Sequence, residues 1–369
     1  MSLWNIINDE SESKIMLIDR YAILPEPLPR EGTLYLAPPM DHTIMKIRNV
    51  ARRCGTVFSE TQFGVIGIPL TGPILETFAD DLENALLPSE LEDTKAFILP
   101  PSESISLMHM TMVDSLDFLL ARFKSEWLVE IFHENRFFMF FQPIVNSQNP
   151  QDVFGYECLL RARNAAGDLI FPKPIFDIAR RADLLFYLDQ AFRIDAIKDA
   201  ARHEISQSLF INFNPISIYD PVQCVRTTVQ TINEANISPQ RIVFEVVESD
   251  EVKDTNHLLQ ILDFYRKSGF KVALDDLGAG YNSLNMMAKI KPDFIKIDIE
   301  LITDVHRDHY KAVVVSKLIE MAQKLNVITV AEGIENKEDW LWVKNHNIDY
   351  VQGYLFARPA SPPPQPVVP

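Results

Sequence analysis

The sequence predicts an α/β protein in which a barrel of eight strands and their helices follows a smaller α/β domain. After Asn135, eight short apolar segments rich in β-branched and aromatic residues recur along the chain. Amphipathic helical stretches fill most of the gaps between them. A chain of 369 residues, 47% of them hydrophobic, is long enough for about two domains.

The first 105 residues show a mixed pattern of short strands and helices bounded by Pro and Gly. It predicts strands at residues 15–18, 33–36, 63–68 and 96–99, and helices at 45–53 and 74–87. No nucleotide-binding loop, metal cluster or nucleophile signature occurs there, and we interpret the single His42 as structural. We expect a regulatory or sensory domain over residues 1–105, with a signal or partner that the sequence does not identify.

Residues 106–134 carry apolar side chains spaced mostly three and four apart. This stripe contains Met110, Met112, Val113, Leu116, Phe118, Leu119, Phe123, Trp127, Leu128 and Ile131. The spacing predicts one connecting helix, which either transmits a signal between the two halves or pairs in a dimer.

The remainder of the chain predicts the barrel domain, residues 135–359, and a tail. Its strands are expected at residues 137–145, 156–162, 209–214, 242–248, 271–277, 294–298, 328–334 and 350–356, and helices at 184–201, 221–235, 255–268, 309–325 and 337–346. Alternating strands and helices predict a TIM (β/α)8 barrel. The gap between the first two strands is too short for a crossover helix, so these strands should pair antiparallel and the barrel is a modified one. The Pro-rich residues 360–369 predict an extended, disordered tail.

Charge and composition exclude several classes of function. The formal charge of −16 argues against binding to a DNA or RNA duplex, which requires basic patches. The three scattered cysteines lack metal-ligand spacing and fit a reducing compartment. No signal-peptide pattern and no apolar run long enough to span a membrane is evident. We therefore expect a cytoplasmic protein.

Polar and charged residues interrupt the apolar strands near their ends, where barrel enzymes place their chemistry. The run 272–274 ends in Asp275 and Asp276, followed by Gly278 and Gly280. Side chains alternate along a strand, so both carboxylates converge on one pocket only if the strand ends there. Residues that share a face with apolar neighbours add to this set: Asn212, Glu245, Lys296, Asp298, Glu332 and Gln352.

Several carboxylates in one place repel one another unless cations or hydrogen-bond donors satisfy them. Glu245, Asp275, Asp276 and Glu332, with Asn212, would form an oxygen cage suited to one or two hard divalent cations. Lys296 could neutralise part of the cluster or act on a metal-bound water. For any single member, a buried salt bridge is the alternative interpretation.

The ordered motifs of this region resemble those of one known family. They are Phe141-Gln142-Pro143-Ile144-Val145, Glu157-Cys158-Leu159-Leu160-Arg161, Phe210-Ile211-Asn212, Phe244-Glu245-Val246-Val247-Glu248, Asp275-Asp276-Leu277-Gly278-Ala279-Gly280, Ile295-Lys296-Ile297-Asp298, Ala331-Glu332-Gly333-Ile334-Glu335 and Gln352-Gly353-Tyr354. Together they resemble the EAL-domain cyclic di-GMP phosphodiesterases over about 230 residues. Cys158, Leu277, Ala279 and Arg180 depart from the family pattern, and none of these changes removes an expected metal ligand.

The resemblance implies hydrolysis of cyclic di-GMP to linear pGpG with two divalent cations, Mg²⁺ or Mn²⁺, and a homodimer. It assigns metal ligands to Glu157, Asn212, Glu245, Asp275, Asp276 and Glu332, and water activation to Lys296 with Glu332 and Glu157. Arg161, Gln142, Asp298, Gln352 and Glu335 would face the substrate, and Glu248 would stabilise the loop after Asp276. Only the resemblance places Glu157 in the site, because it lies early in its strand.

Two other functions are compatible with the same barrel. One is a catalytically silent cyclic di-GMP receptor, and the other is an interaction protein that keeps the barrel for dimerisation alone. Loss of a metal ligand would favour the receptor, and the sequence shows none lost.

Overall fold

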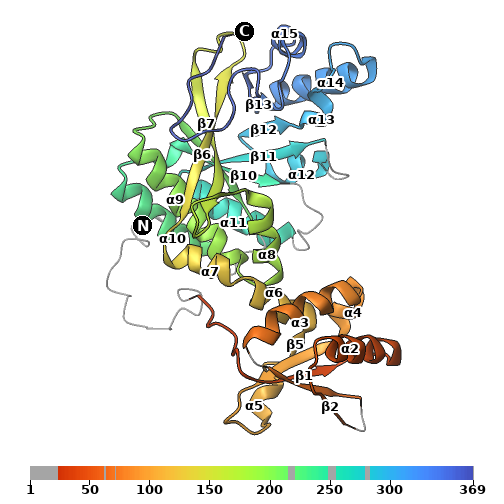
Figure 1. The fold of residues 1–369 in the computed structure, drawn as a ribbon. Helices are drawn as coiled ribbons and strands as arrows, with labels where there is room; N and C mark the ends of the chain where they lie inside the picture. The colour runs from red at the N-terminus through yellow and green to blue at the C-terminus, as the bar shows by residue number, and fades with distance from the viewer. Residues whose placement is uncertain are drawn as a thin grey trace. The chain divides into compact units, whose positions relative to one another are not determined.

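The computed structural model describes residues 24–61, 64–70, 72–214, 221–247, 255–278 and 283–368. They fall into two compact units. Figure 1 shows the fold, with the chain coloured by residue number. The barrel unit takes in Arg136–Pro172 and Asp189–Pro369, and the N-terminal unit takes in Ile18–Asn135 and Lys173–Leu188. A segment from within the predicted barrel domain thus belongs to the N-terminal unit. The predicted strand at 15–18 lies outside the described residues.

The barrel unit is built on one continuous ring of strands. These are β6 (Phe137–Asn146), β7 (Val153–Arg163), β8 (Leu169–Ile170), β9 (Ser208–Phe213), β10 (Ile242–Val247), β11 (Lys271–Leu277), β12 (Phe294–Ile297), β13 (Ile328–Ala331) and β14 (Tyr350–Val351). Their order is β6-β14-β13-β12-β11-β10-β9-β7-β8, and pairing of β6 with β7 closes the barrel. All eight predicted strands are present, but the last two, expected at residues 328–334 and 350–356, are confined to Ile328–Ala331 and Tyr350–Val351. The two-residue β8 on the edge of β7 was not expected.

The first two barrel strands pair antiparallel, as predicted. Phe137 lies opposite Ala162 and Val145 opposite Val153, whereas β7 pairs parallel with β9 and the next strands continue in parallel to β14. Only Ser147–Asp152 separate β6 from β7, which leaves room for a turn but not for a helix.

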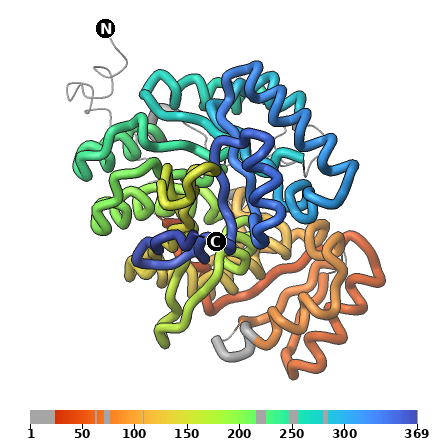
Figure 2. Tube along the Cα trace, turned by 90° about the horizontal axis from the view of Figure 1, so that it is seen from above, coloured from red at the N-terminus to blue at the C-terminus, as the bar shows by residue number. Residues whose placement is uncertain are grey.

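Helices connect the parallel strands. They are α8 (Pro172–Arg181), α9 (Leu185–Arg202), α10 (Pro221–Glu234), α11 (Thr255–Lys267), α12 (Ser283–Ile290), α13 (Ile299–Ile302), α14 (His309–Leu325) and α15 (Lys337–Asn345). In Figure 2 the chain passes from green through teal to blue as it goes round the barrel. No helix in the described ranges is long and apolar enough to cross a membrane.

An apolar layer fills the barrel interior and forms the floor of the site. Its buried members come from six different strands: Ile144, Phe210, Val243, Ala273, Phe294 and Val330. Phe210 and Phe294 meet edge to face, with ring centroids 5.3 Å apart. Each of these side chains is fully buried, so the layer closes the barrel interior with apolar packing.

The N-terminal unit contains a five-stranded sheet in the order β2-β3-β1-β4-β5. Its elements are β1 (Gly32–Ala37), α2 (Asp41–Arg53), β2 (Ser59–Glu60), β3 (Ile66–Leu70), α3 (Gly72–Ala85), α4 (Pro88–Asp93), β4 (Lys95–Leu99), α5 (Leu107–Met110), β5 (Asp114–Ser115), α6 (Leu116–Lys124) and α7 (Glu126–His133). All pairings are antiparallel, and the helices pack on a core that includes Leu34, Ile47, Phe78 and Leu120. The expected small α/β fold is present.

The single helix predicted over residues 106–134 is wrong. Asp114 and Ser115 pair with β4 as the edge strand β5, so the chain is extended there. Ser115 then caps α6, its Oγ accepting a hydrogen bond from the Phe118 N–H at 3.1 Å. Helical spacing in the sequence was overridden by this strand pairing, which joins residues about 20 positions apart.

The expectation of an extended, mobile tail is wrong for residues 360–368. Phe141 and Ala360 form an antiparallel bridge, in which each backbone N–H donates to the carbonyl of the other. Farther along, the Val367 N–H donates to the Phe356 carbonyl at 2.8 Å. The tail therefore folds back onto the barrel, because β6 offers unpaired backbone groups that it satisfies.

Candidate active site

The polar residues of the site occupy the next inward-facing position along the chain after the residues of the apolar floor. Asn212, Glu245, Asp275 and Lys296 each follow a floor residue by two positions on its strand, and Glu332 follows Val330 by two positions, directly after the end of β13. Gln352 follows the half-buried Tyr350 with the same spacing. Because side chains alternate between the two faces of a strand, this spacing turns them all inward at one level. The arrangement was predicted from the sequence.

Lys296 lies at the centre of these residues, with only 1% of its surface exposed. Its Nζ is 2.7 Å from Glu332 Oε1, 2.8 Å from Glu245 Oε1 and 2.9 Å from Asp275 Oδ1. Glu157 Oε1 lies farther away, at 3.9 Å. One ammonium group balances one charge, so a site with several ionised carboxylates keeps an excess of negative charge.

Asp275 and Asp276 face the same pocket because the strand is irregular there. β11 spans Lys271–Leu277, as predicted, so it runs one residue past the two aspartates. Its register with β12 shifts between Leu274 and Leu277, and Asp276 has a left-handed φ of +53°. A bulge of this kind redirects a side chain that would otherwise point to the opposite face. Carboxylate oxygens of Asp275, Asp276 and Glu332 consequently lie within 4.8 Å of one another.

Burial and mutual repulsion perturb the ionisation of this cluster. Burial, with the charges of Glu157 and Asp275, raises the pKa of Glu245 well above its usual value despite Lys296. Burial and the neighbouring Asp275 raise the pKa of Asp276 to about 6. Burial lowers the pKa of Lys296, but the surrounding carboxylates outweigh it and raise that pKa well above its ordinary range. The charged forms of the acids therefore require more positive charge than Lys296 supplies.

Glu157 enters the site from β7 and is held by two amides. Gln352 Nε2 donates to Glu157 Oε2 at 2.5 Å, and Asn212 Nδ2 donates to Oε1 at 3.4 Å. Glu245 differs, because its Oε2 is fully buried and has no hydrogen-bond partner among the described residues. An anionic oxygen without a donor is costly in a protein interior, whereas it is a suitable ligand for a hard cation. The residues thus fit a divalent metal.

A pocket of about 260 Å³ opens above the cluster. Its lining contains seven of the predicted site residues: Gln142, Glu157, Asp276, Asp298, Glu332, Glu335 and Gln352. Asp298 also caps α13, its Oδ1 accepting from the Glu300 N–H at 2.7 Å. Gly353 also lines the pocket. Its backbone lies so close to Ile334 that a Cβ at this position would be 2.0 Å from the Ile334 carbonyl oxygen, so a larger residue does not fit.

Arg161 lies four residues after Glu157 on β7 and is 7% exposed. Its Cζ is 4.9 Å from the ring centroid of Phe140 and 5.4 Å from that of Phe171. Nη1 donates to the Leu160 carbonyl, while the buried Nε has no hydrogen-bond partner within the described ranges. Two aromatic rings therefore fix the guanidinium in place. Arg161 is not among the residues that line the 260 Å³ pocket.

The sequence interpretation missed Phe140 and Phe171 as parts of the site, and it gave Tyr354 no role although this residue stands in the Gln352-Gly353-Tyr354 motif. Tyr354 lines the pocket and follows Gln352 by two positions, so the alternation that identified Gln352 also pointed to it. Phe140 and Phe171 gave no signal, because aromatic residues are common in strands and their contact with Arg161 is not local. Glu248 lies outside the described residues.

Comparisons with known proteins agree with this geometry. The family model for the EAL domain matches residues 125–359. The Escherichia coli protein named "Probable cyclic di-GMP phosphodiesterase PdeD" is 26% identical over 268 residues, 71% of this chain and 49% of that protein. "Probable cyclic di-GMP phosphodiesterase PdeB" from the same organism is 30% identical over 225 residues, 59% of this chain and 42% of that protein. The chain thus spans about half or less of the length of these curated relatives.

Solved structures show the same fold. A standalone EAL protein from Vibrio cholerae O395 in its c-di-GMP bound form is 33% identical, with a TM-score of 0.57 over 63% of this chain and 95% of that one. BlrP1 of Klebsiella pneumoniae, solved as a manganese and cyclic di-GMP complex, is 22% identical, with a TM-score of 0.56 over 89% of this chain and 96% of that one. The matched segment, the closed barrel and its acidic centre lead to one conclusion: this chain belongs to the EAL domain family.

Proposed function

We propose that the protein hydrolyses cyclic di-GMP to linear pGpG with a water activated by two divalent cations. The observation that carries this proposal is the cluster around Lys296, in which the carboxylates outnumber the single ammonium group beneath an open pocket. Relatives named as probable cyclic di-GMP phosphodiesterases support the choice of substrate.

The residues suited to hold the cations divide into two groups that share Asp275. Glu157, Asn212, Glu245 and Asp275 would hold one ion, while Asp275, Asp276 and Glu332 would hold the other. Mg²⁺ and Mn²⁺ both accept such oxygen ligands. When bound, a pair of divalent cations neutralises phosphate charge, lowers the pKa of a bound water and stabilises the leaving oxygen.

The side chains of the protein bind, orient and shield the reactants. Lys296 orients the attacking water through its buried ammonium group, whose raised pKa keeps it a hydrogen-bond donor. Arg161, whose guanidinium is held between Phe140 and Phe171, would bind a substrate phosphate. Gln142, Asp298, Glu335 and Gln352 line the pocket in positions to contact the nucleotide. A dianionic substrate can thereby enter an acidic protein.

Turnover of cyclic di-GMP tests the proposal directly. Purified protein is incubated with cyclic di-GMP and Mg²⁺ or Mn²⁺, and pGpG is measured by chromatography. Glu157→Gln removes a ligand charge while keeping the side chain's shape, so we expect turnover to be lost. The matched control is Asp263→Asn, which alters a surface carboxylate whose ion pair, among the described residues, is with Lys267 on α11. Formation of pGpG that is independent of Glu157 contradicts the proposal.

The same assay separates the other functions. Binding of cyclic di-GMP without turnover identifies a silent receptor, and absence of both binding and turnover identifies an interaction protein. We further propose that residues 1–105 regulate the domain at 135–359, and that the protein works as a homodimer. Light scattering during size-exclusion chromatography measures the oligomeric state, and a monomer at micromolar concentration contradicts the dimer.

A further inference from the structure

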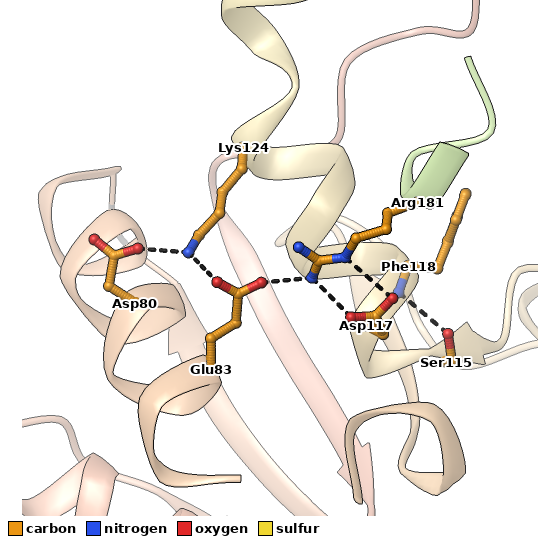
Figure 3. Close-up of polar contacts among 7 residues, drawn as sticks. All are labelled: Asp80, Glu83, Ser115, Asp117, Phe118, Lys124 and Arg181. Atoms are coloured by element: carbon orange, nitrogen blue, oxygen red, sulfur yellow. Dashed lines mark hydrogen bonds and ion pairs between the residues drawn. The ribbon is translucent and has the colours of Figure 1, made fainter. Parts of the chain in front are cut away.

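A chain of alternating charges within the N-terminal unit ends on a segment that follows a barrel strand. Arg181, in the last turn of α8, donates through Nη2 to Glu83 Oε1 at 2.5 Å and to Asp117 Oδ1 at 2.7 Å. Lys124 pairs with the other oxygen of Glu83 and, at 2.6 Å, with Asp80. Figure 3 shows these five side chains as one line across α3, α6 and α8.

Arg181 is the residue that ties α8 to the other two helices in this line. Its Nε also donates to Asp117 Oδ2, at 3.4 Å, so both carboxylate oxygens of Asp117 are engaged. A two-point contact of this kind fixes the direction of the guanidinium as well as its position. Burial opposes the charged state of Arg181, but hydrogen bonding to Asp117, the larger effect, raises its pKa above the usual value. The helix end is therefore held in orientation.

The opposite end of α8 is joined in the chain to Phe171. Phe171 is the only residue between β8 and α8, which begins at Pro172. β8 is in turn paired with β7 at Ala162 and Arg163, directly after Arg161. The Phe171 ring is one of the two that flank the Arg161 guanidinium. Because Phe171 directly precedes α8 in the chain, a displacement of α8 would also move the Phe171 ring that flanks Arg161.

We infer that Arg181 is a positioning residue: through it, α3 and α6 of the N-terminal unit fix the position of the Phe171 ring beside the Arg161 guanidinium. The position of this ring in turn sets the affinity of the site for the substrate phosphate. The inference rests on the proposed function for the identity of the substrate. The helix that transmits the effect is α8, because one of its ends belongs to the N-terminal unit and the other is joined to a strand of the barrel unit. Such coupling requires only that the two ends move together, as a short helix of ten residues does.

Two variants and a matched control test this role. Arg181→Met removes the charge and keeps the aliphatic stem. Lys173→Met removes a charge from the same helix, where Lys173 pairs, within the part of the chain that the structure describes, with Asp177 one turn away. The double variant Arg181→Glu with Asp117→Arg restores an opposite-charge pair in reversed order.

Steady-state kinetics with cyclic di-GMP and Mn²⁺ give the first measurement. We expect Arg181→Met to raise KM about 5-fold, at the lower end of typical coupling between sites, with kcat changed less than about twofold. Lys173→Met should leave both constants unchanged, and the double variant should recover most of the wild-type KM. Equal effects of the two single variants, or a fall in kcat alone, overturn the inference.

Amide hydrogen exchange without nucleotide gives the second measurement and does not depend on activity. We expect Arg181→Met to speed exchange at residues 164–176, which cover β8 and the start of α8. Faster exchange confined to residues around Arg181 overturns the inference. If the wild-type protein forms no pGpG, the proposed function fails while exchange still decides the coupling. If Arg181→Met does not fold, Glu83→Gln, which removes one arm of the contact, should shift exchange in the same residues to a smaller extent.

Discussion

Gln352 Nε2 donates a hydrogen bond to Glu157 Oε2 and so joins the end of the last barrel strand to the second strand across the site. Glu157 is the one proposed ligand whose orientation depends on amide side chains from other strands. Groups that orient a metal ligand in this way matter nearly as much as the ligand itself.

Replacing Gln352 should therefore impair the site without unfolding the barrel. We expect Gln352→Met to lower kcat/KM by about 10- to 100-fold, because the carboxylate of Glu157 is no longer held in place. Gln148→Met is the control, since Gln148 donates to the Lys344 carbonyl at the surface. Activity of Gln352→Met equal to that of the control would show that Glu157 needs no support from Gln352.

Lys296→Met should destabilise the protein when no divalent cation is present. Removing the ammonium leaves buried carboxylates uncompensated, at a cost of about 3–5 kcal/mol. Thermal unfolding with EDTA and with Mn²⁺ measures this effect. Mn²⁺ should raise the Tm of Lys296→Met more than that of the wild type. An unchanged Tm in EDTA would mean that the acids are already neutral.

Because of the buried carboxylate of Glu90, we expect the unfolding free energy of the N-terminal unit to depend on pH. Burial raises its pKa, but hydrogen bonds from the Leu87 N–H, Lys46 and Thr43 outweigh burial and lower the pKa from 4.5 to about 2. The folded state thus binds the proton less tightly than the unfolded state. The stabilisation, about 3 kcal/mol, is complete above pH 4.5 and is lost as the pH falls towards 2.

Denaturant unfolding of the wild type and of Glu90→Gln, at pH 7 and at pH 3, checks this prediction. The difference in unfolding free energy between the two proteins should shrink at pH 3. A difference that is the same at both pH values would assign the effect of the substitution to packing or hydrogen bonding alone.

Gly353→Ala should disturb the end of β14. A Cβ there would lie 2.0 Å from the Ile334 carbonyl oxygen and 2.4 Å from its nitrogen, both of them backbone atoms. We expect a loss of about 1–3 kcal/mol in unfolding free energy, together with reduced activity, because Gln352 is the preceding residue. Wild-type Tm and activity would show that the backbone at Ile334 yields easily.

The sequence was informative where structure depends on alternation along a strand. The two-residue spacing from Phe210 to Asn212, and from Phe294 to Lys296, placed polar side chains in the barrel interior correctly. The bulge at Asp276 was not predicted, because no sequence pattern indicates the backbone conformation that redirects its carboxylate. Glu157 was found only through family resemblance.

Contacts between distant parts of the chain could not be predicted. Arg181 is 98 positions from Glu83 and 64 from Asp117, and no periodicity connects residues so far apart. The same reason explains the two wrong expectations. Pairing of Ser115 with Lys95 broke a helix, and pairing of Ala360 with Phe141 ordered the tail.

A segment from within the barrel sequence belongs to the N-terminal unit, and this limits where the chain can be divided to make fragments or fusion proteins. Lys173–Leu188 packs with the N-terminal unit, and Leu184 and Leu188 within it are fully buried. A fragment starting at Arg136 would carry this segment without the N-terminal unit to which it belongs. Fusing the barrel to a foreign sensor would therefore require the acceptor surface for residues 173–188 to be transplanted as well.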